Sequence, residues 1–126
     1  MIGSHLRKDQ PLLAARIRTA TKRGLQVYRL DAGGNDWLMP IAAHLHSAPA
    51  EWVKQLSEIA TALAKAKSLT LPAGIQAGTV SAAAQHIADQ LLAGANSEKQ
   101  AIFLGALAIA HPNASDLHVL AEFIAQ

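Results

Sequence analysis

Cysteine is absent from this 126-residue chain. Without cysteine, the chain can form no disulfide framework, no thiolate metal site and no cysteine nucleophile. Iron–sulfur clusters held by cysteine thiolates are excluded within these residues for the same reason. The absence fits a reducing compartment.

Aromatic residues are also scarce, at 4% of the chain, although hydrophobic residues make up 51%. Much of this apolar content is alanine, which favours helices that pack closely on a small sheet. No apolar run reaches the roughly 18 residues that a membrane span needs, and the N-terminus shows no hydrophobic signal-peptide region. We therefore expect a soluble chain with one core, and we predict a single α/β domain over residues 1–126.

Acidic residues are rare in the first part of the chain, where Asp9 is the only one before Asp31. The cations of this part are Arg7, Lys8, Arg16, Arg18, Lys22, Arg23 and Arg29. The group Arg16, Arg18, Lys22 and Arg23 is predicted to form a cationic helix face that is either solvated or docked on an acidic neighbouring protein. Nucleic acid binding is disfavoured, because no aromatic residues interleave with these cations and no glycine-rich RNA motif accompanies them.

The first 34 residues predict a strand, a helix and a second strand. Met1–Ser4 is interpreted as a short strand, although Gly3-Ser4-His5 also resembles an expression-cloning remnant. Pro11 begins a helix with an apolar stripe, and Gly24 ends it. A strand over residues 25–30 follows, and this order implies parallel pairing. The predicted fold class is α/β, a Rossmann-like three-layer arrangement in which Ala/Leu-rich helices flank a small parallel sheet.

Further elements are predicted along the rest of the chain. Helices are expected over residues 37–47, 50–67 and 80–94, and a final helix capped by Asn113 or Ser115 is expected to run to Gln126. A buried strand is expected over 101–104, with 106–110 already helical. Lys54, Glu58 and Lys65 are expected to face solvent on the helix over residues 50–67.

Two positions have the layout of a nucleotide site. Gly3 and Ser4 end the first predicted strand, and Asp31 ends the next one. A glycine lets a phosphate approach the backbone, and an acid one strand–helix unit later can hold a ribose hydroxyl. The full G-x-G-x-x-G fingerprint is absent. The alternative is a tight strand–helix turn with an ordinary turn aspartate, and both interpretations stay open.

The histidines predict no metal site. His44 and His46 are two apart in a predicted helix, so we expect them to point to different sides. His111 and His118 are separated by Pro112, which interrupts a shared helix face. No cysteine or carboxylate accompanies either pair at ligand spacing. No nucleophile-elbow serine and no suitably spaced pair of carboxylates occur, so no catalytic residues are predicted.

The opening IGSHLRKDQPLLAARIRTATKRGLQVYRLDAG resembles a block of the molybdopterin oxidoreductase superfamily. There, a strand ends in Gly-Ser-Asn, a Pro-led helix carries arginines and ends in Lys/Arg-Gly, and the next strand ends in an Asp-led turn. The closer resemblance is to the family of large iron–sulfur subunits of bacterial NADH:quinone oxidoreductase, respiratory complex I. The segments DWLMP at 36–40, SAAAQ at 81–85 and LGALAIAHP at 104–112 extend it over nearly the whole chain.

This resemblance implies a fragment of the molybdopterin-oxidoreductase-like C-terminal region of such a subunit. In the superfamily, the positions matching Gly3, Ser4, His5 and the turn that begins at Asp31 help to hold a pterin dinucleotide. Here His5 stands where Asn is usual, and Ala32-Gly33 stands where Pro-Arg is usual. The lost arginine removes a bidentate partner for a phosphate or a guanine. The resemblance therefore implies a non-catalytic fragment with vestigial cofactor positions, no cofactor of its own, and iron–sulfur clusters elsewhere in the parent subunit.

The resemblance also implies the partners and the cellular location of the chain. The partners would be other subunits of the peripheral arm of complex I, on the cytoplasmic side of the bacterial inner membrane, with no nucleic acid and no direct membrane insertion. The isolated fragment would self-associate if part of its sheet is uncovered. Two alternatives are a small nucleotide- or phosphate-binding α/β module and a fragment of a true molybdenum or tungsten oxidoreductase; the departures from the superfamily pattern count against the latter.

Overall fold

The computed structural model describes residues 1–34, 36–94 and 100–126. The chain divides into two compact units. The sheet unit comprises Met1–Pro49 and Phe103–His111, and the helical unit comprises Ala50–Ile102 and Pro112–Gln126. The described residues form helices and a small parallel sheet, which confirms the α/β class. No described helix is long and apolar enough to cross a membrane.

The sheet of the first unit is parallel and very short. Strand β1 (Tyr28–Asp31) pairs with β2 (Ala43–His46). Ile2 forms parallel bridges to both Leu30 and Leu104, so single residues extend the sheet beyond β1. Parallel pairing is confirmed, but the strands expected over residues 1–4 and 101–104 are each reduced to a single bridging residue, Ile2 and Leu104. The first of them ends at once because Gly3, with φ +58°, turns the chain.

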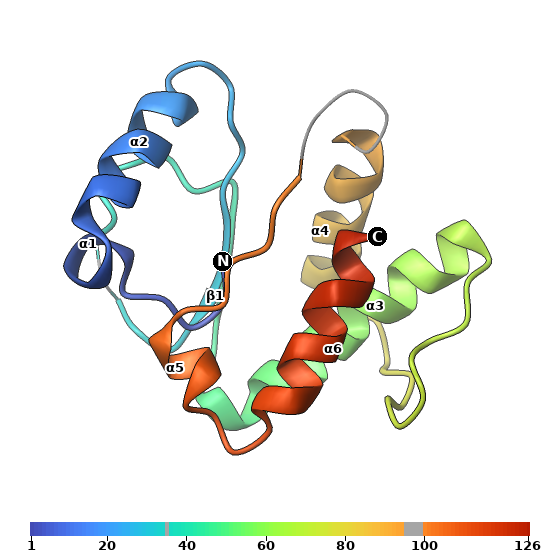
Figure 1. Ribbon diagram of the computed structural model, residues 1–126. Coiled ribbons are helices and arrows are strands. Elements are labelled where there is room, and N and C mark those ends of the chain that lie inside the picture. Colours follow the sequence, from blue (N-terminus) through green and yellow to red (C-terminus); the bar gives the residue numbers. More distant parts are fainter. Residues whose placement is uncertain (35, 95–99) are drawn as a thin grey trace. The chain divides into compact units, whose positions relative to one another are not determined.

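Three helices accompany this sheet: α1 (Leu6–Asp9), α2 (Pro11–Thr21) and α5 (Ala106–Ile109). Figure 1 shows α1 and α2 next to one another in blue. Pro11 occupies the first turn of α2, and Gly24 takes φ +101° just after its end, as the sequence indicated. Leu6, Ala14, Ile17, Val27 and Trp37 form the buried cluster of this unit.

The prediction of a helix over residues 37–47 is wrong, because the chain forms β2 in this segment. The backbone N–H of Ala42 donates to the carbonyl of Val27, and that of Ser47 donates to the carbonyl of Asp31. These bonds join β2 to β1, whose paired residues lie 15 positions earlier in the sequence. Within β2 the exposure of the side chains alternates, as the two-residue period of a strand requires.

The helical unit contains α3 (Trp52–Lys67), which follows the 3-10 turn η1 (Pro49–Glu51), together with α4 (Ala82–Gly94) and α6 (Ala114–Ala125). Helix α3 packs against both α4 and α6. The side chains of Trp52, Leu117 and Leu120 are fully buried. These three helices confirm the sequence prediction with small shifts at their ends, because each carries a long apolar face.

Glu58 does not face solvent as expected. It is 7% exposed, and its Oε2 accepts a hydrogen bond from the Ser81 backbone N–H at 3.2 Å. The irregular segment before α4 passes over this side of α3, where Gly78 lies against Glu58. The helical pattern of α3 does not reveal this coverage, since it comes from residues some twenty positions later in the chain.

Candidate functional site

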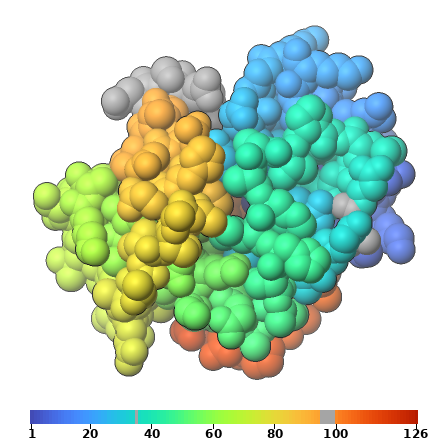
Figure 2. All heavy atoms as spheres, turned by 180° about the vertical axis from the view of Figure 1, so that it is seen from behind, coloured from blue at the N-terminus to red at the C-terminus, as the bar shows by residue number. Residues whose placement is uncertain are grey.

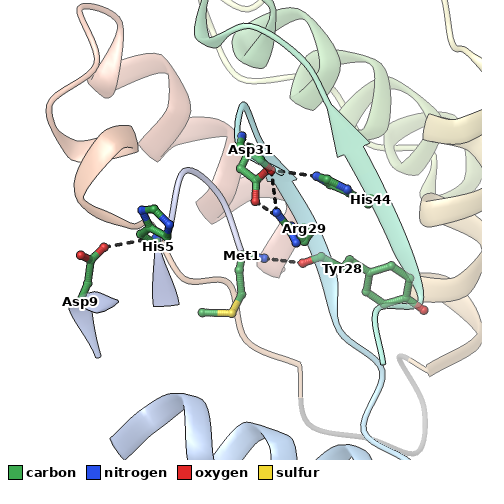
Figure 3. Close-up of polar contacts among 8 residues, drawn as sticks. Met1, His5, Asp9, Tyr28, Arg29, Asp31 and His44 are labelled. Atoms are coloured by element: carbon green, nitrogen blue, oxygen red, sulfur yellow. Dashed lines mark hydrogen bonds and ion pairs between the residues drawn. The ribbon is translucent and has the colours of Figure 1, made fainter. Parts of the chain in front are cut away.

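The polar centre of the sheet unit is Asp31, the last residue of β1, which is 3% exposed. Its Oδ2 accepts a hydrogen bond from Arg29 Nε at 2.6 Å. Its Oδ1 accepts one from the Gly33 backbone N–H at 3.2 Å and lies 3.0 Å from His44 Nε2. Figure 3 shows Arg29 and His44 converging on this carboxylate. Both carboxylate oxygens are therefore engaged within the chain.

Arg29, the ion-pair partner of Asp31, is also buried and makes several contacts of its own. It is 7% exposed, its Nη2 donates to the carbonyl of Gly33 at 2.9 Å, and its guanidinium lies over the ring of Trp37 at 4.8 Å. A buried charge pair of this kind tolerates burial only when the remaining donors and acceptors are satisfied. The contacts to Gly33 and Trp37 supply that support.

The surroundings of Asp31 favour its ionised form. Burial alone raises the pKa of the carboxyl group, but the hydrogen bonds from Arg29 and His44 and their charges outweigh burial and lower the pKa below its ordinary value. Asp31 is therefore an anion at neutral pH. It can serve as a hydrogen-bond acceptor or as a ligand for a cation.

The two histidines of β2 lie on the same side as this carboxylate. In the parallel register Arg29 is opposite His44, and Asp31 is opposite His46. Because side chains two apart in a strand share a face, the predicted opposite orientation of His44 and His46 is wrong. The imidazole rings lie 5.4 Å apart, edge to face. One ligand atom from each of Asp31, His44 and His46 lies within 4.8 Å of the other two.

The predicted cofactor positions at the start of the chain are occupied by protein contacts. Gly3 is buried, and its N–H donates to the carbonyl of Leu30 while its own carbonyl accepts from the Leu107 N–H. Gly105 lies so close to Gly3 and Ser4 that a side chain there would collide with their backbone. The N–H of His5 donates to the carboxylate of Asp9. Gly3 thus lies beside the strand that ends in Asp31, but the Gly3–Ser4 turn is covered by the segment around Gly105.

The N-terminal amine is part of the same region. It donates to the carbonyl of Tyr28 at 2.8 Å, as Figure 3 shows. Burial lowers its pKa from 8.0 to about 6, although the charge of Asp31 partly opposes this change. The amine is therefore largely neutral in the folded chain at pH 7.

The cationic face of α2 is exposed in the structure. It consists of Arg16 and Arg18 within the helix and Lys22 and Arg23 just after it. Figure 2 shows the end of this segment, in blue, at the surface. Within residues 1–34, 36–94 and 100–126, none of the four forms an ion pair with an acidic side chain. This face is free to meet solvent or a partner.

The sequence analysis named Asp31 as a candidate site residue but did not include Arg29, His44 and His46. The available signal was the two-residue spacing in His44-Leu45-His46 and in Arg29-Leu30-Asp31. Each triplet places its two polar side chains on one face of a strand, and parallel pairing aligns the two triplets. Recognising the cluster required residues 43–46 to be assigned as a strand.

No protein-family model, no curated protein and no solved structure matches the chain significantly. The function is therefore inferred from the geometry described above and from the order of the short sequence motifs.

Proposed function

We propose that the chain is a non-catalytic scaffold fragment of the large iron–sulfur subunit of a respiratory NADH:quinone oxidoreductase. The parent complex passes electrons from NADH through iron–sulfur clusters to quinone, and this fragment supplies packing and subunit contacts. The resemblance of the motifs at residues 2–33, 36–40, 81–85 and 104–112 supports the proposal. So does the parallel order in which Leu104, Ile2, β1 and β2 follow one another, which suits one edge of a Rossmann-like three-layer domain.

The observation that carries the proposal is the internal engagement of Asp31. A nucleotide or pterin ribose would have to displace Arg29 or His44 from its carboxylate. Displacement of Arg29 would leave a buried charge unpaired, which costs several kcal/mol, on the order of 3–5. Because Arg29 occupies the carboxylate that a ligand would need, this region is better suited to a structural role than to ligand binding.

In this proposal the contact with other subunits runs through the cationic face formed by Arg16, Arg18, Lys22 and Arg23. An acidic surface of a neighbouring peripheral-arm subunit, on the cytoplasmic side of the membrane, is the expected partner. The apolar side chains Phe103, Leu107 and Ile109 are also exposed in this chain. They would favour self-association of the isolated fragment.

The native reading frame on both sides of residues 1–126 tests the proposal first. Cysteine-rich cluster motifs upstream, continuous with this block, are the expected result. A start codon at Met1 with a stop codon after Gln126 would overturn the proposal.

Charge reversal tests the contact. Replacing Arg16, Arg18, Lys22 and Arg23 with Glu in the parent subunit should lower the yield of assembled complex on native gels. The matched control reverses two exposed cations at the end of α3, Lys65→Glu and Lys67→Glu, and should leave assembly unchanged. Equal assembly in both variants would contradict a contact through α2.

A second candidate is a nucleotide- or phosphate-binding module, which the position of Asp31 at the carboxyl end of β1 favours. A ligand present at about 100 times its dissociation constant would add roughly 2.7 kcal/mol to the free energy of unfolding. Thermal shift with ATP, GTP, NADH and inorganic phosphate separates the candidates. A rise in melting temperature would favour the module, and no shift is expected for the scaffold.

A further inference from the structure

We propose that Asp31, His44 and His46 form a binding site for a divalent transition-metal ion of borderline softness, with Zn²⁺ as the best-matched ion. The three side chains come from β1 and β2, and the site is independent of the proposed scaffold function. All of its residues belong to the sheet unit.

The spacing of the three groups suits one ion. Ligand atoms bound tetrahedrally at about 2.0–2.1 Å from zinc lie roughly 3.3 Å from each other. Asp31 Oδ1 and His44 Nε2 are already 3.0 Å apart, and all three ligand atoms lie within 4.8 Å of one another. His46 therefore needs only a side-chain adjustment to complete the set. Its place on an exposed strand position leaves room for that movement.

The donor set selects the class of ion. Two imidazole nitrogens and one carboxylate oxygen suit Zn²⁺, Ni²⁺ or Cu²⁺, whereas Mg²⁺ and Ca²⁺ prefer sites made of oxygen atoms. Three protein ligands leave a further coordination position for water. The two histidines are exposed and Asp31 is buried, so an ion can enter from the solvent side.

The surrounding contacts hold the carboxylate ready for an ion. Arg29 Nε occupies Oδ2 and the Gly33 N–H contacts Oδ1, which fixes the orientation of Asp31. Such outer contacts to a ligand commonly orient it for the metal. The ion would replace the proton shared by His44 Nε2 and Asp31 Oδ1, and the neutral imidazole would then carry its proton on Nδ1. Because the charge of Arg29 opposes a cation, we expect weaker binding than at a structural zinc site.

The competing explanation is that His44 simply supports the Asp31–Arg29 pair. That explanation accounts for His44 but gives the His46 side chain only its ring contact with His44, since this side chain makes no hydrogen bond or ion pair with any residue in the described part of the chain. The two explanations therefore differ in what they predict for His46.

Calorimetric titration of the whole 126-residue chain with Zn²⁺ in a non-coordinating buffer at neutral pH provides the test. We expect a single ion per chain for the unaltered protein. His46→Ala should weaken binding by at least about tenfold, because loss of a direct ligand should cost no less than loss of an outer contact, which costs about 10–100-fold. Mg²⁺ should give no binding heat.

The matched control is His118→Ala. His118 Nε2 lies 3.1 Å from Glu122 on the exposed face of α6, so it is a histidine–carboxylate pair with no third ligand in the described structure. This variant should bind Zn²⁺ as the unaltered chain does. Melting temperatures without metal should agree for all three proteins, because both histidines are exposed.

A second readout is the visible absorption of the Co²⁺-loaded chain, which reports coordination by nitrogen and oxygen ligands and should change in His46→Ala but not in His118→Ala. Three results would overturn the proposal: no Zn²⁺ binding by the unaltered chain, equal affinity in His46→Ala, or equal losses in both variants, which would indicate adsorption to surface histidines.

Discussion

The two compact units stabilise a buried carboxylate in different ways. In the sheet unit, Asp31 is paired with the buried cation Arg29. In the helical unit, Glu58 has no ion-pair partner among the described residues and accepts a hydrogen bond from the backbone N–H of Ser81, just before α4. A helix N-terminus favours an anion without any charged side chain. The buried carboxylate of the sheet unit is thus stabilised by a charge pair, whereas that of the helical unit is stabilised by a backbone donor. The stability of the helical unit then rests mainly on apolar packing.

Breaking the charge pair should have the largest effect. Arg29→Ala leaves the Asp31 carboxylate buried without its cation, and we expect the free energy of unfolding to fall by about 3–5 kcal/mol. Urea denaturation measures the change. The control is Lys54→Ala, which breaks the exposed Lys54–Glu51 pair and should cost about 0–1 kcal/mol. If Arg29→Ala lowers the free energy of unfolding by less than about 1 kcal/mol, the charge pair is not what stabilises Asp31, and the proposed difference between the two units is wrong.

Apolar packing should dominate in the helical unit. Leu120 is fully buried on α6, and Leu120→Ala should cost about 2–5 kcal/mol because it removes buried methyl groups and leaves a cavity. The neighbouring Val119→Ala, at an exposed position, should change stability by less than about 0.5 kcal/mol. Urea denaturation of both variants gives the comparison, and similar losses would show that α6 does not pack as described.

The N-terminal amine should add a pH dependence to the sheet unit. Its pKa falls from 8.0 to about 6 on folding, so between these values the unfolded chain binds more protons than the folded chain. Stability from this group therefore rises as the pH increases from 6 to 8, by roughly 2–3 kcal/mol at most. Below pH 6 the amine is protonated in both states, so the folded chain carries the full cost of burying its charge and this pH dependence levels off.

Unfolding measured at several pH values tests this expectation for the chain with a free amine. Acetylation of Met1 removes the titrating group, so the acetylated chain should show a flatter dependence between pH 6 and 8. An unchanged slope after acetylation would assign the dependence to other groups.

The smallest effect is expected at Glu58. Glu58→Gln keeps an oxygen that can accept from the Ser81 N–H but removes the charge that favours the start of α4, so a loss of about 1 kcal/mol is expected. Glu51→Gln, at an exposed position, is the control and should change stability by less than about 0.5 kcal/mol. Thermal unfolding can rank the two. A loss as large as that of Arg29→Ala would mean that Glu58 has a cation partner after all.

The contrast between the units also explains which parts of the fold were predictable. Helices α3, α4 and α6 are long enough for a repeating apolar face, so their sequences indicate them directly. Helix α1 and strand β2 have four residues each, and at that length a local pattern does not separate helix from strand. Pairing with Val27 and Asp31 decided the conformation of residues 42–47.

The candidate site follows the same division. Asp31 could be identified because it ends a strand that its own sequence predicts. His44 and His46 could not be joined to it, because their shared face exists only once residues 43–46 form a strand in register with β1. The turn at Gly3 was predicted, but its coverage by Gly105 depends on a segment about one hundred residues later.

Composition and local periodicity are enough to indicate the absence of thiolate chemistry, the cationic face of α2 and the three long helices. The pairing of Arg29 with Asp31 inside the protein, the covering of Glu58 and the position of two histidines beside a buried carboxylate follow from tertiary packing alone. The reason is physical: burial and strand register depend on segments that are distant in the chain, and their positions are established only when the chain packs.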